Sequence, residues 1–433
     1  MQVHPVSIES LGDRLSRIAA DRTGGRDRDD AGTTSPDRAA AAWQVQVTSE
    51  YADVSTGAVE APIVSVTDWD GVLRHFGLDP AEFEIVDDTV RMSRWQQSKR
   101  TESGDRDVVW LHSYKARFRR IQGRLPDEDL AQITKMVSRW RPSRPKAAKA
   151  SGGAPCTFYV GWADWQLGKG EADGLAGTTA RVLASFEATV ARLAELRRMG
   201  RNITRISVWN MGDPVEGCEG HYAAQTATVQ ANQRQQLNLA LSLWLTGLRA
   251  LAPLTDSLEF GSVICNHGEW TRRGGKAITD DSDNVGGYLA DTIRAVLEGR
   301  PGFGHLEFTI PHDEMTMLTT MSGVPVALTH GHKMPGSAKE LDWIKSQSIR
   351  LLRETGTEPR LWMTAHRHHL DVRDFGSHYR IQHPALDAGS KWFSDATGMW
   401  ATPGTLTMLV GEHEQAGGPL AEGGRGWSDL AVV

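Results

Sequence analysis

Length, composition and charge leave room for a globular protein and exclude several other classes. The chain has 433 residues, of which 39% are hydrophobic and 24% charged, and its formal net charge is −6. No segment reaches the roughly 18 to 20 uninterrupted apolar residues of a membrane span, and the scattered cysteines Cys156, Cys218 and Cys265 do not form a disulfide framework. The first residues lack the apolar core of a secretory signal. We therefore expect a cytoplasmic protein with no membrane contact.

The N-terminal third is predicted to be divided into three parts. Residues 1–60 are expected to be mostly disordered, because their polar, glycine-rich and aperiodic composition cannot bury enough apolar surface. Residues 62–140 are expected to form a small basic α+β domain, with helices over 69–79 and 127–141 and alternating strands over 82–97 and 106–121. Residues 141–155, rich in Pro, Ser, Gly and basic residues, are typical of a linker.

Positive charge is concentrated in one window of the chain. Residues 91–150 contain sixteen Lys and Arg but six Asp and Glu, a net charge of +10 in an acidic protein. Aromatic residues lie between the basic ones, a combination that binds phosphate backbones and stacks on bases. The sequence therefore predicts DNA binding here, with a solvated basic strand as the alternative. The candidate nucleic-acid-binding residues are Arg94, Trp95, Lys115, Arg117 and Arg119.

Strands and helices alternate from residue 156 onward, which favours an α/β fold. This domain is expected to span 156–415, with helices over 178–200, 223–251, 284–298 and 337–354, followed by a flexible tail over 416–433. The ends of five predicted strands carry side chains of the kinds that can bind metals. In α/β sheets, ligands bind outside the carboxyl ends of the strands, so the five loops can converge. The residues concerned are Asp164, Gln166, Asp213, Asn266, His267, His330, His332, His366 and His368.

The order of these motifs resembles the calcineurin-like metallophosphoesterase superfamily, whose pattern is DxH, GDxx(D/E)G, GNH(D/E), HG or HGH, and GHxH. The resemblance covers residues 156 to about 375. It implies a four-layer α/β/β/α sandwich and two divalent metal ions bridged by Asp213. The first ion would be held by Asp164, Gln166, Asp213 and His368, and the second by Asp213, Asn266, His330 and His366.

The resemblance also implies roles for residues around the metals. His267 would act as general acid on the leaving oxygen, and Glu216 occupies the place of an acid that orients this histidine. His332, Arg272 and Arg273 are candidates for substrate binding, with solvated loop positions as the alternative. Mixed carboxylate, amide and imidazole ligands suit Mn²⁺, Fe²⁺ or Zn²⁺ better than an all-oxygen Mg²⁺ cage, and we favour Mn²⁺.

The sequence departs from the family pattern at the first metal site. Gln166 replaces the histidine of the first motif, and an amide oxygen is a weaker ligand for such ions than an imidazole nitrogen. Cys265 and Ala365 stand where the family has glycines, and Gly268 separates His267 from the next acid, Glu269. The first metal site is therefore expected to be weaker than the second or tuned to another ion.

The function that the sequence favours is phosphodiester cleavage in DNA. The catalytic motifs are similar to those of the Mre11/SbcD nuclease branch, and the first motif and appended domain are similar to metallophosphoesterases of phages of high-GC actinobacteria, which would act in the host cytoplasm. A partner ATPase and a homodimer are left open. The alternatives are a phosphomonoesterase or protein phosphatase, and a degenerate member that binds DNA without catalysis. A structural zinc site is disfavoured because such sites are rich in cysteine.

Overall fold

The structure is a computed structural model with a mixed α/β fold, which confirms the predicted class. It describes residues 44–47, 51–55, 69–75, 78, 80, 83–86, 89–100, 105–120, 125–142, 153–222, 225–273, 276–389, 394, 398, 400–413, 416 and 424–433. The predicted disorder of residues 1–60 therefore falls largely outside the described residues. Within that segment, however, Gln44–Val47 (β1) and Tyr51–Ser55 (β2) are strands, because they pair with each other and β2 pairs with a later strand.

Two sheets form the body of the protein. The first has six strands in the order β11-β8-β7-β6-β17-β18, and the second has five in the order β12-β13-β14-β16-β15. Strands β6, β7, β8 and β11 are parallel to one another, as are β13, β14 and β16. The bounds are β6 Cys156–Trp162, β7 Ile203–Asn210, β8 Leu258–Ser262, β11 Leu306–Thr309, β12 Met317–Met321, β13 Val324–Leu328, β14 Leu361–Thr364, β15 Asp371–Asp374, β16 Tyr379–Gln382, β17 Leu406–Val410 and β18 Trp427–Val432.

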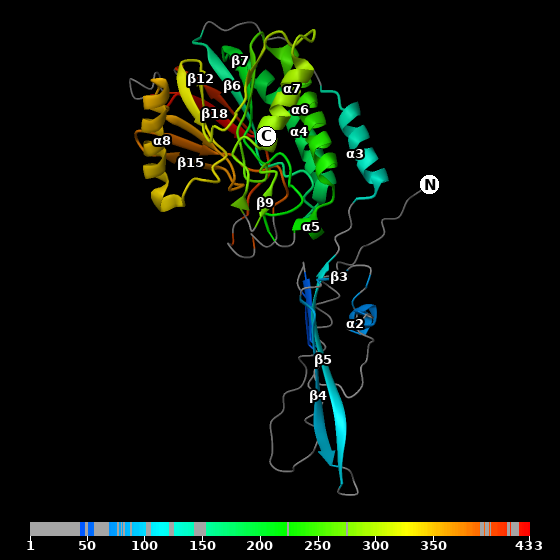
Figure 1. Cartoon of the computed structure of the whole chain (residues 1–433). Helices are drawn as coiled ribbons and strands as arrows, with labels where there is room; N and C mark the ends of the chain where they lie inside the picture. Colours follow the sequence, from blue (N-terminus) through cyan, green and yellow to red (C-terminus); the bar gives the residue numbers. More distant parts are fainter. Residues whose placement is uncertain are drawn as a thin grey trace, which may run out of the picture.

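Apolar side chains bury both faces of the two sheets. Tyr159 and Trp209 of the first sheet pack between the sheets against Val326, Met363 and Ile381 of the second. Helices α4 (Gly174–Arg198), α6 (Gln233–Leu251) and α7 (Val285–Leu297) cover the outer face of the first sheet, and α8 (Glu340–Thr355) covers the outer face of the second (Figure 1). Strand β6 is buried at every residue, on both faces, and its sequence is correspondingly a nearly continuous apolar run.

Local signals explain where the helices begin. A single helix over 223–251 is wrong, because the structure has a short helix α5 (Gln225–Thr228) and then α6. The side chain of Asn232 accepts a hydrogen bond from the backbone of Gln235, whose side chain accepts one from Asn232 in return. This capping box satisfies backbone groups at the start of α6 and ends the preceding segment.

Helix α6 is also the one helix in the described part of the chain that is long and apolar enough to cross a membrane. Half of its most apolar window is buried inside the protein, where Leu243 and Trp244 belong to the core with α4 and α7. Packing in this core accounts for the apolar composition of α6.

The N-terminal residues form a separate, smaller sheet. Strands β1 and β2, with β3 (Phe83–Ile85), β4 (Arg91–Arg100) and β5 (Arg106–Arg120), make an antiparallel sheet in which β2, β3 and β4 all pair with β5. Its small core joins Ala52, Phe83 and Phe118 to Leu73 of α2 (Trp69–His75). Beyond this core, β4 and β5 continue as a two-stranded ribbon that projects away from the two-sheet body (Figure 1).

Two segments lie in different places from those the sequence indicates. Helix α3 (Asp127–Arg139), expected in the basic domain, packs instead against α4 and α6, with Ile133 and Val137 in the core of the large domain. Trp427–Val432, expected in a flexible tail, forms the edge strand β18 and pairs with β17. The sequence could not show either result, because both depend on a partner surface distant along the chain.

Candidate metal centre

The candidate ligands lie in loops that follow the carboxyl ends of parallel strands from both sheets. Asp164 and Gln166 follow β6, Asp213 follows β7, and Asn266 and His267 follow β8; His330 and His332 follow β13, and His366 and His368 follow β14. Hydrogen bonds join these loops. The backbone N–H of His366 donates to Asp164 Oδ2 (3.1 Å), and that of His267 donates to Asp213 Oδ1 (3.0 Å). The structure therefore brings the predicted loops of the two sheets together.

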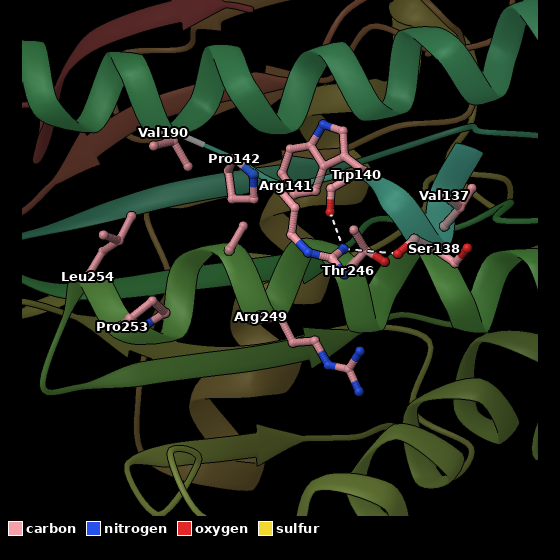
Figure 2. A pocket seen from close by; sticks show the side chains of 11 residues that line it. Val137, Ser138, Trp140, Arg141, Pro142, Val190, Thr246, Arg249, Pro253 and Leu254 are labelled. Carbon is pink, nitrogen blue, oxygen red and sulfur yellow. Dashed lines mark hydrogen bonds between the residues drawn. The ribbon is translucent and has the colours of Figure 1, made fainter. Parts of the chain in front are cut away.

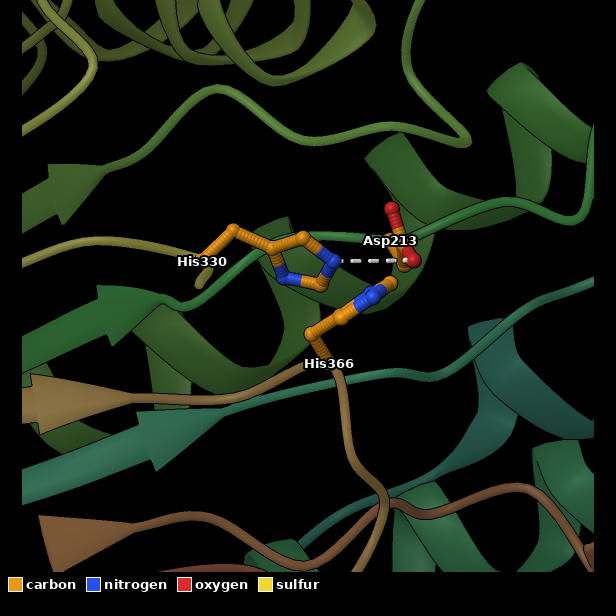
Figure 3. Close-up of side chains that lie close together, drawn as sticks. All are labelled: Asp213, His330 and His366. Carbon is orange, nitrogen blue, oxygen red and sulfur yellow. Dashed lines mark ion pairs between the residues drawn. The ribbon is translucent and has the colours of Figure 1, made fainter. Parts of the chain in front are cut away.

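Asp213, His330 and His366 form a compact group whose ligand atoms lie within 4.8 Å of one another (Figure 3). His330 Nε2 is 3.0 Å from Asp213 Oδ2 and 2.9 Å from Asn266 Oδ1. Its other nitrogen, Nδ1, donates to the carbonyl of Met211 at 2.9 Å. In the neutral ring Nε2 is therefore an acceptor facing two further acceptors, an arrangement that requires a cation or a proton between them.

Burial and neighbouring charges support this interpretation. Burial by itself would raise the pKa of the Asp213 carboxyl, but His330 and His267 hold that pKa well below its ordinary value, so the carboxylate is ionised. Burial also lowers the pKa of His366 to about 3, which keeps the ring neutral. An ionised carboxylate, a neutral imidazole and an amide oxygen are the forms that bind a divalent ion. The residues of the predicted second metal site thus fit a metal.

An unusual backbone conformation is concentrated in the strand-end loops. Asp164, Gln166, Asp213, His366 and His368 all have positive φ, between 41° and 72°, and they are five of the eight non-glycine residues with positive φ in the described ranges. This conformation costs about 1–3 kcal/mol at each residue and is found where the surrounding structure imposes it, most often at functional sites. The strain indicates that the loops are built to aim these side chains.

The predicted first metal site is arranged differently. Gln166 Oε1 accepts a hydrogen bond from Lys169 Nζ at 3.1 Å, and the same ammonium lies 2.5 Å from Asp387 Oδ2. His368 lies between two carboxylates, with Nδ1 3.2 Å from Asp387 Oδ1 and Nε2 3.5 Å from Asp164 Oδ1. The amide oxygen expected to bind a metal is already bound to a cation of the protein, so this site does not fit the predicted ion.

Sequence reasoning missed Lys169 and Asp387. Asp387 follows β16, which is parallel to β14, so its position after a sixth strand end was an available signal. Lys169 carried no signal beyond its place three residues after Gln166. Burial alone would lower the pKa of Lys169, but Asp387, Glu216 and Glu171 outweigh it and raise that pKa, so the ammonium is charged.

His267 is held at the edge of the centre by the loop that contains Glu216. Its Nδ1 donates to the backbone carbonyl of Glu216 at 2.7 Å, while the nearest oxygen of the Glu216 carboxyl lies 3.6 Å away. The carboxyl instead accepts a hydrogen bond from Tyr222 at 2.6 Å, and its burial raises its pKa. Glu216 therefore orients His267 mainly through its backbone. The ring of His221, which the sequence did not single out, stacks on His267 with 4.1 Å between centroids.

The predicted substrate residues lie near the centre to different degrees. The ring of His332 is 5.5 Å from that of His330 and 6.3 Å from that of His366, and burial lowers its pKa to about 3. Arg272 is bound to Glu269 and to the carbonyl of Gly220. The side chain of Arg273 lies outside the described residues. Substrate contact by these three residues stays a prediction.

The predicted nucleic-acid-binding residues lie on the small sheet and its ribbon. Arg94 stacks over the ring of Trp110 at 3.9 Å from the centroid, and Trp95 is 40% exposed. Arg117 is paired with Asp53 at 2.7 Å, and Arg119 is paired with Glu84. Lys115 is exposed and lies opposite Arg91 in the ladder. The charges of Arg117 and Arg119 are thus partly neutralised, whereas Arg94 and Lys115 have no carboxylate as a cross-strand partner.

A separate hollow of about 340 Å³ lies between α3, α4 and α6, away from the metal loops (Figure 2). Its lining includes the cations Arg141 and Arg249 and apolar residues such as Val190 and Leu254, but no carboxylate or histidine. Because it contains no metal ligand or acid–base pair, we place the chemistry in the group of strand-end loops.

Comparison with known proteins gives distant likenesses. No family model and no curated protein matches the sequence. Among solved structures, Vacuolar Protein Sorting 29 complexed with Zn²⁺ from Entamoeba histolytica is 12% identical over 58% of this chain and 84% of that chain, with a TM-score of 0.25. A novel archaeal phosphodiesterase is 8% identical over 64% and 99%, with a TM-score of 0.27. Phosphopantetheinyl hydrolase from Mycobacterium tuberculosis is 9% identical over 58% and 95%, with a TM-score of 0.24. Likenesses at these identities and TM-scores assign no function to this chain.

Proposed function

We propose that this chain is a metal-dependent phosphoesterase of the calcineurin-like kind, and that it cleaves phosphodiesters in DNA. The observation that carries the proposal is the convergence of acceptor atoms from Asp213, Asn266 and His330 beside His366, at the meeting point of two sheets. Burial alone would lower the pKa of His330, but Asp213 outweighs it and raises that pKa, so a proton joins these groups when no metal is bound. A divalent cation would replace that proton and would also bind the neutral ring of His366.

These four residues would hold one divalent cation. Bound there, the cation would supply a Lewis acid that withdraws charge from a phosphoryl oxygen and promotes deprotonation of a water molecule. The mixture of two imidazoles, a carboxylate and an amide favours Mn²⁺, Fe²⁺ or Zn²⁺, and we propose Mn²⁺.

His267 supplies the proton that the leaving oxygen needs. Because Nδ1–H is bound to the Glu216 carbonyl, Nε2 is the nitrogen turned toward the centre. In the imidazolium form, Nε2 gives its proton to the departing oxygen as the P–O bond breaks, and the neutral ring keeps its Nδ1–H on Glu216. General acids of this kind contribute about 10²- to 10⁴-fold in rate.

The activity is tested with bis(p-nitrophenyl) phosphate and Mn²⁺. We expect hydrolysis by the full chain, loss of hydrolysis in Asp213→Ala and His366→Ala, and no change in His312→Ala, whose side chain is 82% exposed. A phosphomonoesterase would prefer p-nitrophenyl phosphate, so the ratio of the two rates separates these classes. A chain inert with Mn²⁺, Zn²⁺, Fe²⁺ and Mg²⁺ that still binds DNA would support the non-catalytic alternative.

DNA as the substrate is supported by the charge and aromatic exposure of the ribbon. Arg94, Trp95 and Lys115 lie on exposed strands, and a cation together with stacked aromatic rings is the usual means of binding single strands. In fluorescence anisotropy with a DNA oligonucleotide, Arg94→Gln and Lys115→Gln should each reduce the slope of log affinity against log salt by about 1. Arg117→Gln, whose cation is already paired with Asp53, is the matched control and should reduce it less. Equal slopes in all the variants would reject the ribbon as the DNA contact.

A further inference from the structure

The side chains of Lys169, Gln166 and His267 form a continuous series of polar contacts. Lys169 Nζ donates to Gln166 Oε1 at 3.1 Å, Gln166 Nε2 lies 3.3 Å from His267 Nε2, and His267 Nδ1 donates to the Glu216 carbonyl at 2.7 Å. The ammonium has donors alone, so it fixes the oxygen of the amide toward itself and the NH₂ toward His267. In the neutral ring that remains after His267 has given its Nε2 proton to the leaving oxygen, Nε2 is the acceptor that this NH₂ requires.

The ammonium is itself held in place from the other side. The Lys169 side chain is 11% exposed, and its Nζ lies 2.5 Å from Asp387 Oδ2 and 3.8 Å from Glu171 Oε2. Asp387 in turn contacts His368 at 3.2 Å. The Lys169 ammonium therefore lies among the residues that were expected to bind the first metal ion, and it contacts the side-chain oxygen of Gln166.

We propose that the chain binds one divalent cation, at Asp213, Asn266, His330 and His366, and that the Lys169 ammonium takes the place of the charge of a second ion. Gln166 is then a positioning residue that links Lys169 to His267 and does not bind metal. A divalent ion at Gln166 Oε1 would share this oxygen with an ammonium, and the two cations would repel each other. This inference rests on the proposed function, because Gln166 positions His267 for that reaction. The number of bound ions, however, is measured without any substrate.

A comparison with the predicted second metal site, at Asp213, Asn266, His330 and His366, supports a single bound ion. There, Asp213 Oδ2 and Asn266 Oδ1 face His330 Nε2. Any positive charge at that position is a proton on the His330 ring, which an incoming divalent ion can displace, whereas the Lys169 ammonium is part of the chain and stays. At the first group, the protein supplies its own cation, and the carboxylate of Asp387 has that cation and His368 as partners. The second site can therefore exchange a proton for an ion, while the first site already contains a fixed positive charge.

The experiment is the Mn²⁺ content of the full chain after equilibrium dialysis, read by native mass spectrometry and by electron paramagnetic resonance. We expect one Mn²⁺ per chain with the spectrum of an isolated ion. The double variant Gln166→His with Lys169→Met, which removes the ammonium and provides an imidazole, should bind two ions and show a spin-coupled spectrum. Lys169→Arg, which keeps the charge, should retain one.

The outcomes separate this inference from the proposed function. Two coupled ions in the wild-type protein would overturn the inference and leave the phosphoesterase proposal standing. One ion in a chain that hydrolyses no phosphodiester would support the inference and reject the proposed activity. No bound ion would reject both. Because the decisive count is made on the wild-type chain, a variant that fails to fold does not prevent the test.

Discussion

At the scale of single residues, the centre depends on backbone positions that the chain adopts at a cost. Asp213 has φ of 48° and follows Gly212, which has φ of 105°. A Cβ at Gly212 would lie 2.3 Å from His330 Nδ1 and 2.8 Å from the Cβ of Cys265. Gly212 is therefore needed both for its conformation and for the space in which His330 reaches the Met211 carbonyl.

Gly212→Ala should consequently weaken metal binding. We expect at least a tenfold loss of Mn²⁺ affinity in titration calorimetry, because His330 must move from its place between Asp213 and Asn266. Gly200→Ala is the matched control, since Gly200 also has positive φ (86°) but open space around its Cβ position. Unchanged affinity in Gly212→Ala would contradict the assignment of His330 as a ligand.

His267 offers a second test at this scale. In His267→Asn the ring that can carry a proton is lost, so kcat should fall about 10²- to 10⁴-fold on DNA, whose leaving oxygen needs a proton. The fall should be smaller on bis(p-nitrophenyl) phosphate, since nitrophenolate leaves without one. Steady-state kinetics on both substrates give the comparison, and an equal fall on the two would argue against the acid role.

At the scale of secondary-structure elements, α3 is attached to the two-sheet body by a narrow apolar stripe. Ile133 and Val137 are buried against α4 and α6, while the rest of the helix is exposed or half-buried. The stripe, and not an acidic cap alone, fixes where this helix lies, because helices of this length gain most of their stability from packing.

Ile133→Ala should lower the free energy of unfolding by about 2 kcal/mol or more, through lost burial and an unfilled cavity. Met136→Ala, at a position 38% exposed, should change it by less than about 0.5 kcal/mol. Urea denaturation of both variants makes the measurement. Equal effects would show that α3 does not pack on the body in solution.

At the scale of the whole molecule, the two sheets are joined by buried polar contacts as well as by apolar packing. His383 donates from Nδ1 to the Thr364 carbonyl at 2.7 Å, and its Nε2 is 2.9 Å from the hydroxyl of Tyr159 on the first sheet. Burial lowers the pKa of His383 to about 4, so the native ring is neutral and Nε2 accepts the Tyr159 hydroxyl proton.

This histidine should make the fold sensitive to acid. The unfolded chain takes up a proton on His383 near pH 6.5, while the native chain resists protonation down to about 4. The stabilising contribution is thus complete above about pH 6.5 and is lost as the pH falls toward 4, by about 1.4 kcal/mol per unit. Urea denaturation with a chelator present should show a shallower pH dependence in His383→Gln than in wild type. His312→Gln, at an exposed position, should match wild type.

Much of the fold and of the candidate metal centre could be predicted, because strong local sequence patterns indicate them. Continuous apolar runs such as "CTFYVGW" indicate strands buried on both faces, and polar residues directly after them indicate loops at one sheet edge. The mixed α/β class and the convergence of the strand-end loops followed from these patterns, while the grouping of Asp213 with His330 and His366 followed from the resemblance to the metallophosphoesterase motifs. The roles of these residues stay predictions until metal binding is measured.

The sequence by itself determined the identity of the strand-end side chains and the alternation of strands and helices, since both depend on short-range apolar periodicity. Tertiary structure alone decided that Lys169 and Asp387 enter the centre, that α3 joins the large domain, and that Trp427–Val432 closes a sheet edge. The physical reason is the separation along the chain over which each interaction acts. Hydrophobic patterning acts within a turn or a strand, whereas an ion pair between residues 218 positions apart exists only once the packed sheets have brought two loops together.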